Sequence, residues 1–425
     1  MMKNKPFQPW RYLVAFSLQY LAVGVFMCVN TLISLSRGLS LSQVSLGLAL
    51  ASLTALALEL PSGMAGDLLG RKRVWLAAAC VTALRVVLLL FCTGPVLLLA
   101  YVLNGAANAL LSGTLDAMYM EEWIHSRGTG TLAKASAWNA AAQTGFMALG
   151  SLAGGALATV PFFRDYTVNL VVMTALQLLA LFWVWRMIPA DPGHRTPQSA
   201  ARPSLPRQFL AQGRVALDAA SGSLSLQLCL LSAAALGFGM IGLEAYWSPR
   251  LQQLAAPGAE LGPLLGVLSC VSMLGALAGS LLCAKFTARC RTQRSRVLAF
   301  LITRGLHAAA LAAVAFALRV PAFALLFTSY YLATGAQATA NDVLLQAAAP
   351  DHVRGTLMSV QNLLVHVGTF LCEALAAFWL ARGGITSFWL LEAAVLLFGT
   401  LAVGALCLAL RARRRKAVEN TPQNG

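Results

Sequence analysis

Long apolar runs separated by short polar segments make up most of this chain. A helix needs about 20 apolar residues to cross the hydrocarbon core of a bilayer. Twelve runs of that kind cover residues 10–35, 42–64, 74–93, 95–118, 132–158, 165–188, 224–248, 261–284, 297–318, 321–347, 357–381 and 386–410. Only helices are expected inside them, because a backbone in lipid must satisfy its polar groups within its own segment. The sequence therefore predicts an all-α membrane protein with twelve transmembrane helices, in contact with the lipid bilayer.

The composition agrees with lipid as the main solvent. Of 425 residues, 58% are hydrophobic and only 11% are charged, whereas soluble domains carry about a quarter charged residues. The net charge of +16 could suggest nucleic acid as a partner. The basic residues, however, lie in short clusters between apolar runs and not along one face of a polar domain. We therefore expect no nucleic-acid partner.

The basic clusters also predict the orientation and the domain organisation. If the N-terminus is inside, the clusters at 71–73, 285–296 and 411–416 all fall on the cytoplasmic side, as the positive-inside rule requires. This predicts a multi-pass protein of the cytoplasmic membrane with both termini in the cytoplasm. The segment between spans six and seven is rich in Pro, Ser, Arg and Gln and is typical of a flexible linker. The predicted parts are a six-helix bundle at 1–188, a cytoplasmic linker at 189–222, a second six-helix bundle at 223–410 and a basic cytoplasmic tail at 411–425.

No motif for bound metal, nucleotide or covalent catalysis is present in the sequence. The nine cysteines are scattered, without a CxxC pair or a Cys/His ligand spacing. The glycine-rich segment 237–242 lies in an apolar run and lacks the Lys that a phosphate loop needs, so helix packing explains it better. We expect no metal, no cofactor, no catalytic residue and no enzymatic activity.

A polar turn with a distinctive spacing joins spans two and three, over residues 63–73. It resembles the loop found at this place in transporters of the major facilitator superfamily. Its matching residues are Gly63, Asp67, Gly70, Arg71 and Lys72, while Ala65 and Leu68 depart from the family pattern. The resemblance implies two pseudo-symmetric six-helix bundles that rock around a central cavity, with this loop as a conformational switch. The alternative is an ordinary positive-inside turn.

Further segments, at 59–63, 112–116 and 354–359, look like a bacterial branch of mostly uncharacterised or drug-exporter-like members of that superfamily. Proton-coupled drug antiporters of the superfamily usually carry an arginine in span four, which is missing here. Their glycine-rich pattern in span five survives at 150–155 without its proline. Arg85 in the adjacent span is a hypothetical substitute for the missing charge.

Ionisable residues inside the predicted spans are candidates for a proton or substrate site, because a charge in lipid is costly unless it faces a partner or a cavity. In the first half, Glu59, Arg85 and Asp116 are expected to form a buried carboxylate–guanidinium network, which could be functional or a static packing element. The second half supplies a further set, comprising Asn341, Asp342, His366, Glu373 and, in span nine, Arg304. His366 is placed near the midplane, where it could relay protons or remain a neutral packing residue.

Several polar and aromatic residues are candidates for lining a central cavity. Gln19 and Asn30 lie about three helical turns apart and could share one stripe of span one. The complete set is Gln19, Asn30, Asn104, Gln143, Glu244, Tyr246 and Trp247. The two aromatic residues at 246 and 247 could instead form a lipid-interface belt.

Together these features predict a secondary active transporter for a small organic solute. The resemblance implies a proton-coupled exporter of drug-like or amphipathic compounds. Protons are the expected coupling ion, and a monomer is the expected state. The alternative within transport is uptake or facilitated passage of a sugar or metabolite, whose sites use amide and tryptophan side chains. The residues that leave room for it are Gln19, Asn30, Asn104, Asn108, Trp138, Asn139 and Gln143. The alternative of another class is a non-transporting membrane receptor or a membrane-embedded enzyme.

Overall fold

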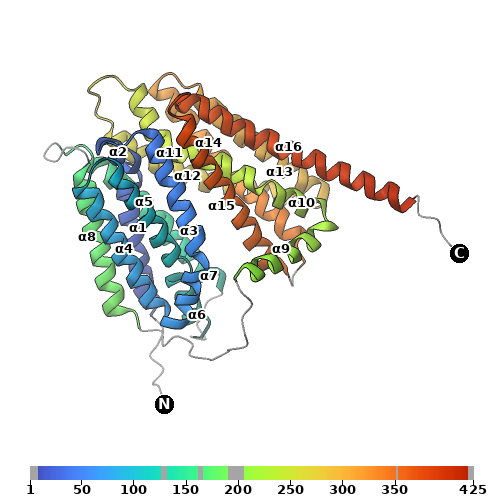
Figure 1. Ribbon diagram of the computed structural model, residues 1–425, viewed down its shortest axis with the longest axis horizontal. Helices are drawn as coiled ribbons and strands as arrows, with labels where there is room; N and C mark the ends of the chain where they lie inside the picture. The colour runs from blue at the N-terminus through green and yellow to red at the C-terminus, as the bar shows by residue number, and fades with distance from the viewer. Residues whose placement is uncertain (1–7, 126–131, 161–165, 190–204, 351–352, 420–425) are drawn as a thin grey trace, which may run out of the picture. The chain divides into compact units, whose positions relative to one another are not determined.

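The computed structural model describes residues 8–125, 132–160, 166–189, 205–350 and 353–419, and within these ranges every regular element is a helix (Figure 1). Ten helices, some of them broken, are long and apolar enough to cross a membrane. The two other predicted spans are the long helices α7 (Leu132–Leu157) and α14 (Val320–Ala348). The prediction of an all-α membrane protein is confirmed.

The contacts between Cα atoms divide the chain into two compact units. The first unit comprises Met1–Ala200 and Trp247–Met273, and the second comprises Ala201–Tyr246 and Leu274–Gly425. Helices α11 (Ala233–Leu254) and α12 (Gly262–Thr287) each contribute residues to both units.

In the first unit, α1 (Trp10–Met27) packs against α7 and α8 (Thr167–Met187), while α5 (Leu98–Leu111) packs against α3 (Leu41–Leu69) and α4 (Arg71–Phe91). The helices are α1 (Trp10–Met27), α2 (Asn30–Ser36), α3 (Leu41–Leu69), α4 (Arg71–Phe91), η1 (Gly94–Leu97), α5 (Leu98–Leu111), α6 (Leu115–His125), α7 and α8 (Thr167–Met187). A Cβ atom on Gly150 or Gly154 of α7 would meet the backbone oxygens of Leu21 and Val25 in α1. These glycines therefore allow the close helix contact that their spacing indicates.

Two of the predicted spans in the first unit are broken helices. Span one is interrupted at residues 28–29, between α1 and α2. Span four is interrupted at residues 112–114, where Gly113 has φ +66°, a conformation that L side chains rarely adopt. The chain then continues as α6 to His125, so span four does not end near residue 118 as the sequence indicated. The break places Asp116 in the first turn of a new helix.

In the second unit, α13 (Gln293–Ala315) packs against α14 and α16 (Gly384–Glu419), and α10 (Leu224–Leu231) also contacts both of these helices. The helices are α9 (Leu205–Ser221), α10 (Leu224–Leu231), parts of α11 and α12, α13 (Gln293–Ala315), α14, α15 (Arg354–Trp379) and α16 (Gly384–Glu419). Gly237 of α11 and Gly368 of α15 lie where a Cβ atom would meet the partner's backbone, at Val365 and Ala234. The glycine-rich segment of α11 thus serves helix packing, as expected.

The predicted linker and tail are partly helical. Residues 205–221 form α9, so the second half of the predicted linker is a helix, while residues 190–204 lie outside the described ranges. Helix α16 continues to Glu419, and residues 420–425 lie outside the described part.

The turn at 63–73 is much shorter than the sequence suggested. Helix α3 runs on through Leu69, and α4 begins at Arg71, so a single residue separates them. That residue, Gly70, has φ +91°, which favours glycine. A Cβ atom on Gly63 would meet nothing within 4 Å. Of these two glycines, only Gly70 has a backbone conformation that favours glycine.

Candidate functional site

Basic residues of the predicted switch loop bind partners inside the first unit. The Nη1 atom of Arg71 lies 2.7 Å from Oε1 of Glu121 in α6. The Lys72 ammonium donates to the backbone oxygens of Trp185, at 2.9 Å, and Ile188, at 2.6 Å. Lys72 thereby satisfies carbonyl groups at the C-terminal end of α8 that have no partner within the helix. The side chain of Asp67 lies outside the described part of the structure.

The charges of Glu59, Arg85 and Asp116 do not form the predicted network. Glu59 is exposed in the second half of α3. The guanidinium carbon of Arg85 lies 4.6 Å from the ring centroid of Phe26, a cation–π contact. Asp116 has found amide partners instead of a guanidinium. The reason is geometric, since the three residues project from different helices toward different neighbours.

Asp116, Asn139 and Gln143 form one hydrogen-bonded group, which we call the amide–carboxylate cluster. Asp116 Oδ1 accepts from Asn139 Nδ2 at 2.7 Å and from Gln143 Nε2 at 3.2 Å. Gln143 Nε2 also lies 3.1 Å from Asn139 Oδ1. The two amides lie one turn apart on α7, so both face the first turn of α6. Asp116 and Gln143 are half-buried, which leaves part of each surface open to a ligand.

The other polar candidates of the first unit stay apart from this cluster. Gln19, Asn30 and Asn104 are half-buried. Within the described ranges, no hydrogen bond joins them to one another or to the amide–carboxylate cluster. The shared stripe of span one remains a prediction.

The polar candidates of the second unit are distributed over α14 and α15. Asn341 is buried, and its Oδ1 accepts from Gln361 Nε2 at 3.0 Å. Asp342 is exposed, and Glu373 is buried. His366 is exposed, with Nδ1–H donating to the Asn362 carbonyl of its own helix at 2.7 Å. Asn341 Nδ2 also donates to Oδ1 of the adjacent Asp342, at 3.5 Å, so Asn341 and His366 belong to different hydrogen-bonded groups.

A buried group around Arg304 was only partly anticipated. Arg304 and His307 of α13 are 1% and 0% exposed, and Thr334 and Gln337 of α14 are buried opposite them. His307 Nε2 lies 3.2 Å from Thr334 Oγ1. We call these four residues the Arg304 cluster. The sequence signal was weak for the two α14 residues, because Thr and Gln are common in such helices without a special role.

Glu392 of α16 was missed. Its side chain is fully buried, and its Oε1 accepts from the Gly242 N–H of α11 at 2.8 Å and from the Cys372 thiol at 3.1 Å. A Cβ atom on Gly242 would overlap this carboxyl group. We call Glu392, Gly242 and Cys372 the Glu392 cluster. An acid inside the apolar run 386–410 was the signal that could have found it.

The aromatic residues at the end of α11 take a role that was not expected. Tyr246 and Trp247 are 1% and 4% exposed. The Tyr246 ring packs edge-on against Phe388, with centroids 6.1 Å apart. These rings therefore lie in the protein interior and form neither a lipid-interface belt nor the wall of an open vestibule. Glu244 is exposed.

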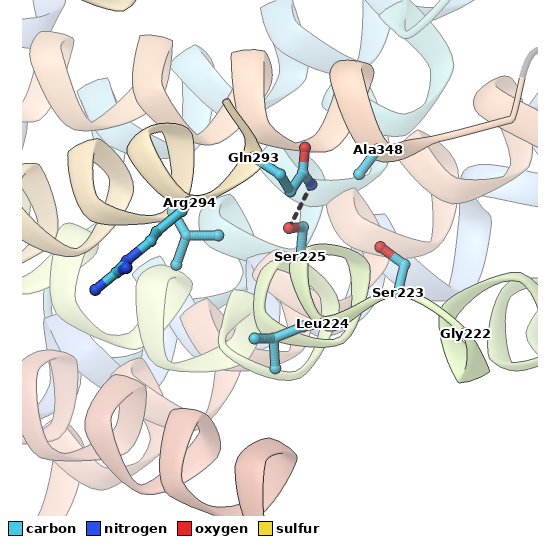
Figure 2. A pocket seen from close by; sticks show the side chains of 8 residues that line it. Gly222, Ser223, Leu224, Ser225, Gln293, Arg294 and Ala348 are labelled. Atoms are coloured by element: carbon cyan, nitrogen blue, oxygen red, sulfur yellow. Dashed lines mark hydrogen bonds between the residues drawn. The ribbon is translucent and has the colours of Figure 1, made fainter. Parts of the chain in front are cut away.

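An open pocket of about 570 Å³ lies in the second unit, at the start of α10 and α13 and the end of α14. Figure 2 shows the Gln293 amide directed at the Ser225 hydroxyl across this pocket, with Arg294 pointing away. It contains none of the predicted site residues. Among the side chains that the structure describes, no group of three His, Cys, Asp or Glu is arranged to hold a metal ion.

Comparisons with known proteins agree with this architecture. Residues 12–372 match the family pattern of the Major Facilitator Superfamily, while a search of curated protein sequences gives no match. Among solved structures, the chain is similar to the nucleoside transporter NupG, with 12% identity and a TM-score of 0.74 over 93% of this chain and 98% of that one. It is also similar to a D-xylose–proton symporter, with 15% identity and a TM-score of 0.65 over 92% and 95%. A bacterial homologue of the human lysosomal transporter Spinster gives 16% identity and a TM-score of 0.65 over 95% and 96%. Since the family pattern covers most of a chain with this helical, membrane-spanning architecture, the protein belongs to the Major Facilitator Superfamily.

Proposed function

We propose that the protein is a secondary active transporter that moves a small polar organic solute across the cytoplasmic membrane by alternating access. The amide–carboxylate cluster carries this proposal. Its carboxylate and two amides offer both acceptors and donors, which are the groups that recognise hydroxyl and amine groups of a polar solute. Asp116 follows a break in span four, and a broken helix at membrane depth is tolerated where it is buried or lines a water-filled cavity.

Protons are the proposed coupling ion, and Glu392 is the proposed carrier in the second unit. An ionised carboxylate in a low-dielectric interior is costly without a cation, and no described basic side chain forms an ion pair with it. Transfer of a proton onto Glu392 removes this cost. Because its Oε1 also holds the Gly242 N–H, its protonation would change a contact between α16 and α11.

The topology proposed with this function follows the positive-inside distribution, with both termini in the cytoplasm and two six-helix bundles at 1–188 and 223–410. We further propose that it works as a monomer. The segments that look like a drug-exporter-like branch favour export. The amide–carboxylate cluster favours a polar solute over an amphipathic drug, because an apolar compound would leave these groups without partners.

Reconstitution into proteoliposomes tests the function and its direction together. The protein would be given a proton gradient of either sign and a panel of polar metabolites, sugars and amphipathic cations, with solute movement measured against empty liposomes. Transport of a polar solute that follows the gradient supports the proposal. Transport of amphipathic cations alone would replace it with the exporter interpretation, and binding without any movement would favour a receptor.

A further inference from the structure

Arg304 is a buried cation whose donors have no acceptor. Its side chain is 1% exposed, and Nε, Nη1 and Nη2 all lack a hydrogen-bond partner among the described residues. Its guanidinium carbon lies 4.9 Å from the ring centroid of Phe300, and its charge also interacts with the thiol of Cys229 in α10. A guanidinium stays charged in proteins, and a buried charge is normally paired. The structure therefore lacks a negative partner for Arg304.

Further unpartnered polar atoms lie beside it. The hydrogen bond between His307 and Thr334 sets the register of the antiparallel helices α13 and α14. One turn back along α13 and one turn forward along α14, Arg304 and Gln337 come opposite each other. Gln337 is 1% exposed, and its Nε2 also has no partner in the described part of the chain. Two sets of donors thus face the same interhelical space.

The hydrogen bonds of Thr334 place one proton of His307 on Nε2. The Thr334 hydroxyl donates to the Tyr330 carbonyl at 2.9 Å, so it accepts from His307 Nε2–H. In the neutral ring, Nδ1 is then an acceptor, and it has no described donor. The His307 ring also packs on Tyr330, with centroids 4.9 Å apart. With a neutral His307 the site holds a single cation, an amide donor, an acceptor nitrogen and aromatic neighbours.

We propose that Arg304 and Gln337 form a subsite for the carboxylate of a small organic anion, which makes such anions the solute class of this transporter. The guanidinium presents paired N–H groups that match a carboxylate in a bidentate geometry, and the amide supplies a further donor. The rings of Phe300 and Tyr330 favour an organic over an inorganic anion, since they offer apolar surface to its carbon chain. The nitrogen atoms are closed to solvent in this conformation, so the anion enters when the helices part during the cycle.

This inference rests on the proposed transport function, but ligand binding tests it without transport. The purified full-length protein would be heated in detergent with lactate, propionate, lactamide or chloride, and its Tm measured at increasing concentration. Lactate and lactamide have nearly the same shape, but only lactate is charged. Lactate and propionate are expected to raise the Tm progressively, as a ligand of the native state does, and lactamide and chloride are expected to leave it unchanged.

Matched variants assign the effect to the subsite. R304Q should abolish the shift, R304K should weaken it because the bidentate fork is lost, and R319Q should retain it, because Arg319 is exposed at the start of α14. If R304Q does not fold, the Tm shifts of R304K and the wild-type comparison of lactate with lactamide still test the subsite. An equal shift with lactamide or with chloride, or an undiminished shift in R304Q, would overturn the proposal.

A static ion pair is the competing account, with Asp342 as the counter-charge on α14. In that case D342N would strongly lower the Tm, and the double variant R304Q/D342N would be more stable than R304Q alone, which would also overturn the subsite.

Failure of the proposed transport function gives a different result from failure of the subsite. If no solute moves in proteoliposomes while the Arg304-dependent shift persists, the transport proposal fails and the subsite stands. If neutral solutes are transported and R304Q alters neither transport nor Tm shifts, the subsite fails and transport stands.

Discussion

The polar groups of the two units are satisfied in different ways. In the first unit, Asp116 is half-buried and accepts hydrogen bonds from two amide side chains, while part of its surface stays accessible. In the second unit, Arg304 and Glu392 are almost completely buried and keep polar atoms without described partners. A satisfied, accessible group suits reversible solute binding. A buried group whose polar atoms lack hydrogen-bond partners suits a step in which a proton or a charged solute binds or leaves. In a low-dielectric interior, the free energy of such a group depends strongly on whether that partner is bound.

The largest effect is expected at Glu392. Glu392→Gln keeps an oxygen for the Gly242 N–H but cannot lose a proton. If Glu392 is the carrier, proton-driven accumulation should disappear, and a gradient of one pH unit supports about tenfold accumulation per proton. Solute exchange without a gradient should continue. Uptake time courses with and without the gradient make this measurement.

Glu260→Gln is the control for that experiment, because it removes an exposed carboxylate from the loop between α11 and α12. It should accumulate solute as the wild type does. If Glu392→Gln still concentrates solute against its gradient, Glu392 is not the proton carrier. The difference in burial between the two units would then not reflect a division between solute binding and proton transfer.

A smaller effect is expected at the accessible cluster of the first unit. Asp116→Asn replaces charge-assisted hydrogen bonds by neutral ones, a loss of about 1 to 2 kcal/mol or roughly 5- to 30-fold in solute affinity. Equilibrium binding of the transported solute to the purified protein measures it. The same substitution should leave proton-dependent steps intact. Unchanged affinity in a variant that is folded, as judged by its Tm, would show that the cluster only joins α6 to α7.

Gly70 and Gly63 both match the family pattern of the predicted switch loop, but only Gly70 has a backbone conformation that favours glycine. Gly70→Ala should lower the free energy of unfolding by about 1 to 2 kcal/mol, because Gly70 has a positive φ that a Cβ atom disfavours. Gly63→Ala should be neutral or stabilising by up to about 1 kcal/mol, because it lies in a helix with open space around it. Denaturant titration in mixed micelles compares them. Equal losses would mean that Gly63 has a close neighbour in another state of the cycle.

The smallest effect is expected for the ion pair of Arg71 and Glu121. Its side chains are 23% and 53% exposed, and exposed pairs contribute about 0.2 to 1 kcal/mol. A double-mutant cycle with Arg71→Gln and Glu121→Gln, read on turnover, should give a coupling energy in that range. A much larger coupling would mean that the pair controls a conformational step and not just the ends of α4 and α6.

Much of the fold could be predicted from the sequence, because span length and hydropathy are local properties. The twelve apolar runs correspond to long helices, and the glycines of 150–155 and 237–242 lie at close helix contacts. The length of the turn before Arg71 could not be predicted in this way. Its polar composition suggested a loop, but residues with adequate helix propensity extended α3 until Gly70 ended it.

The site was harder to predict than the fold. Arg85 and Asp116 were expected to pair because both were charged and in adjacent spans, yet each found a nearer partner, in Phe26 and in the amides of α7. The positions of Tyr246 and Trp247 at a predicted membrane boundary suggested an exposed belt, but the rings are buried. Rotation of a helix about its axis decides such contacts, and an apolar run with few polar residues does not define that rotation.

By itself, the sequence determined that this chain needs a bilayer, that it crosses it as helices, and that its basic loops give it a preferred orientation. These follow from the cost of polar backbone and charge in hydrocarbon, which each segment meets on its own. Only the tertiary structure decided that Asp116 meets Asn139 and Gln143, that Glu392 holds the backbone of Gly242, and that Arg304 is left without a counter-charge. Those are properties of pairs of helices, because a hydrogen bond requires two groups from different segments to lie within about 3 Å of each other.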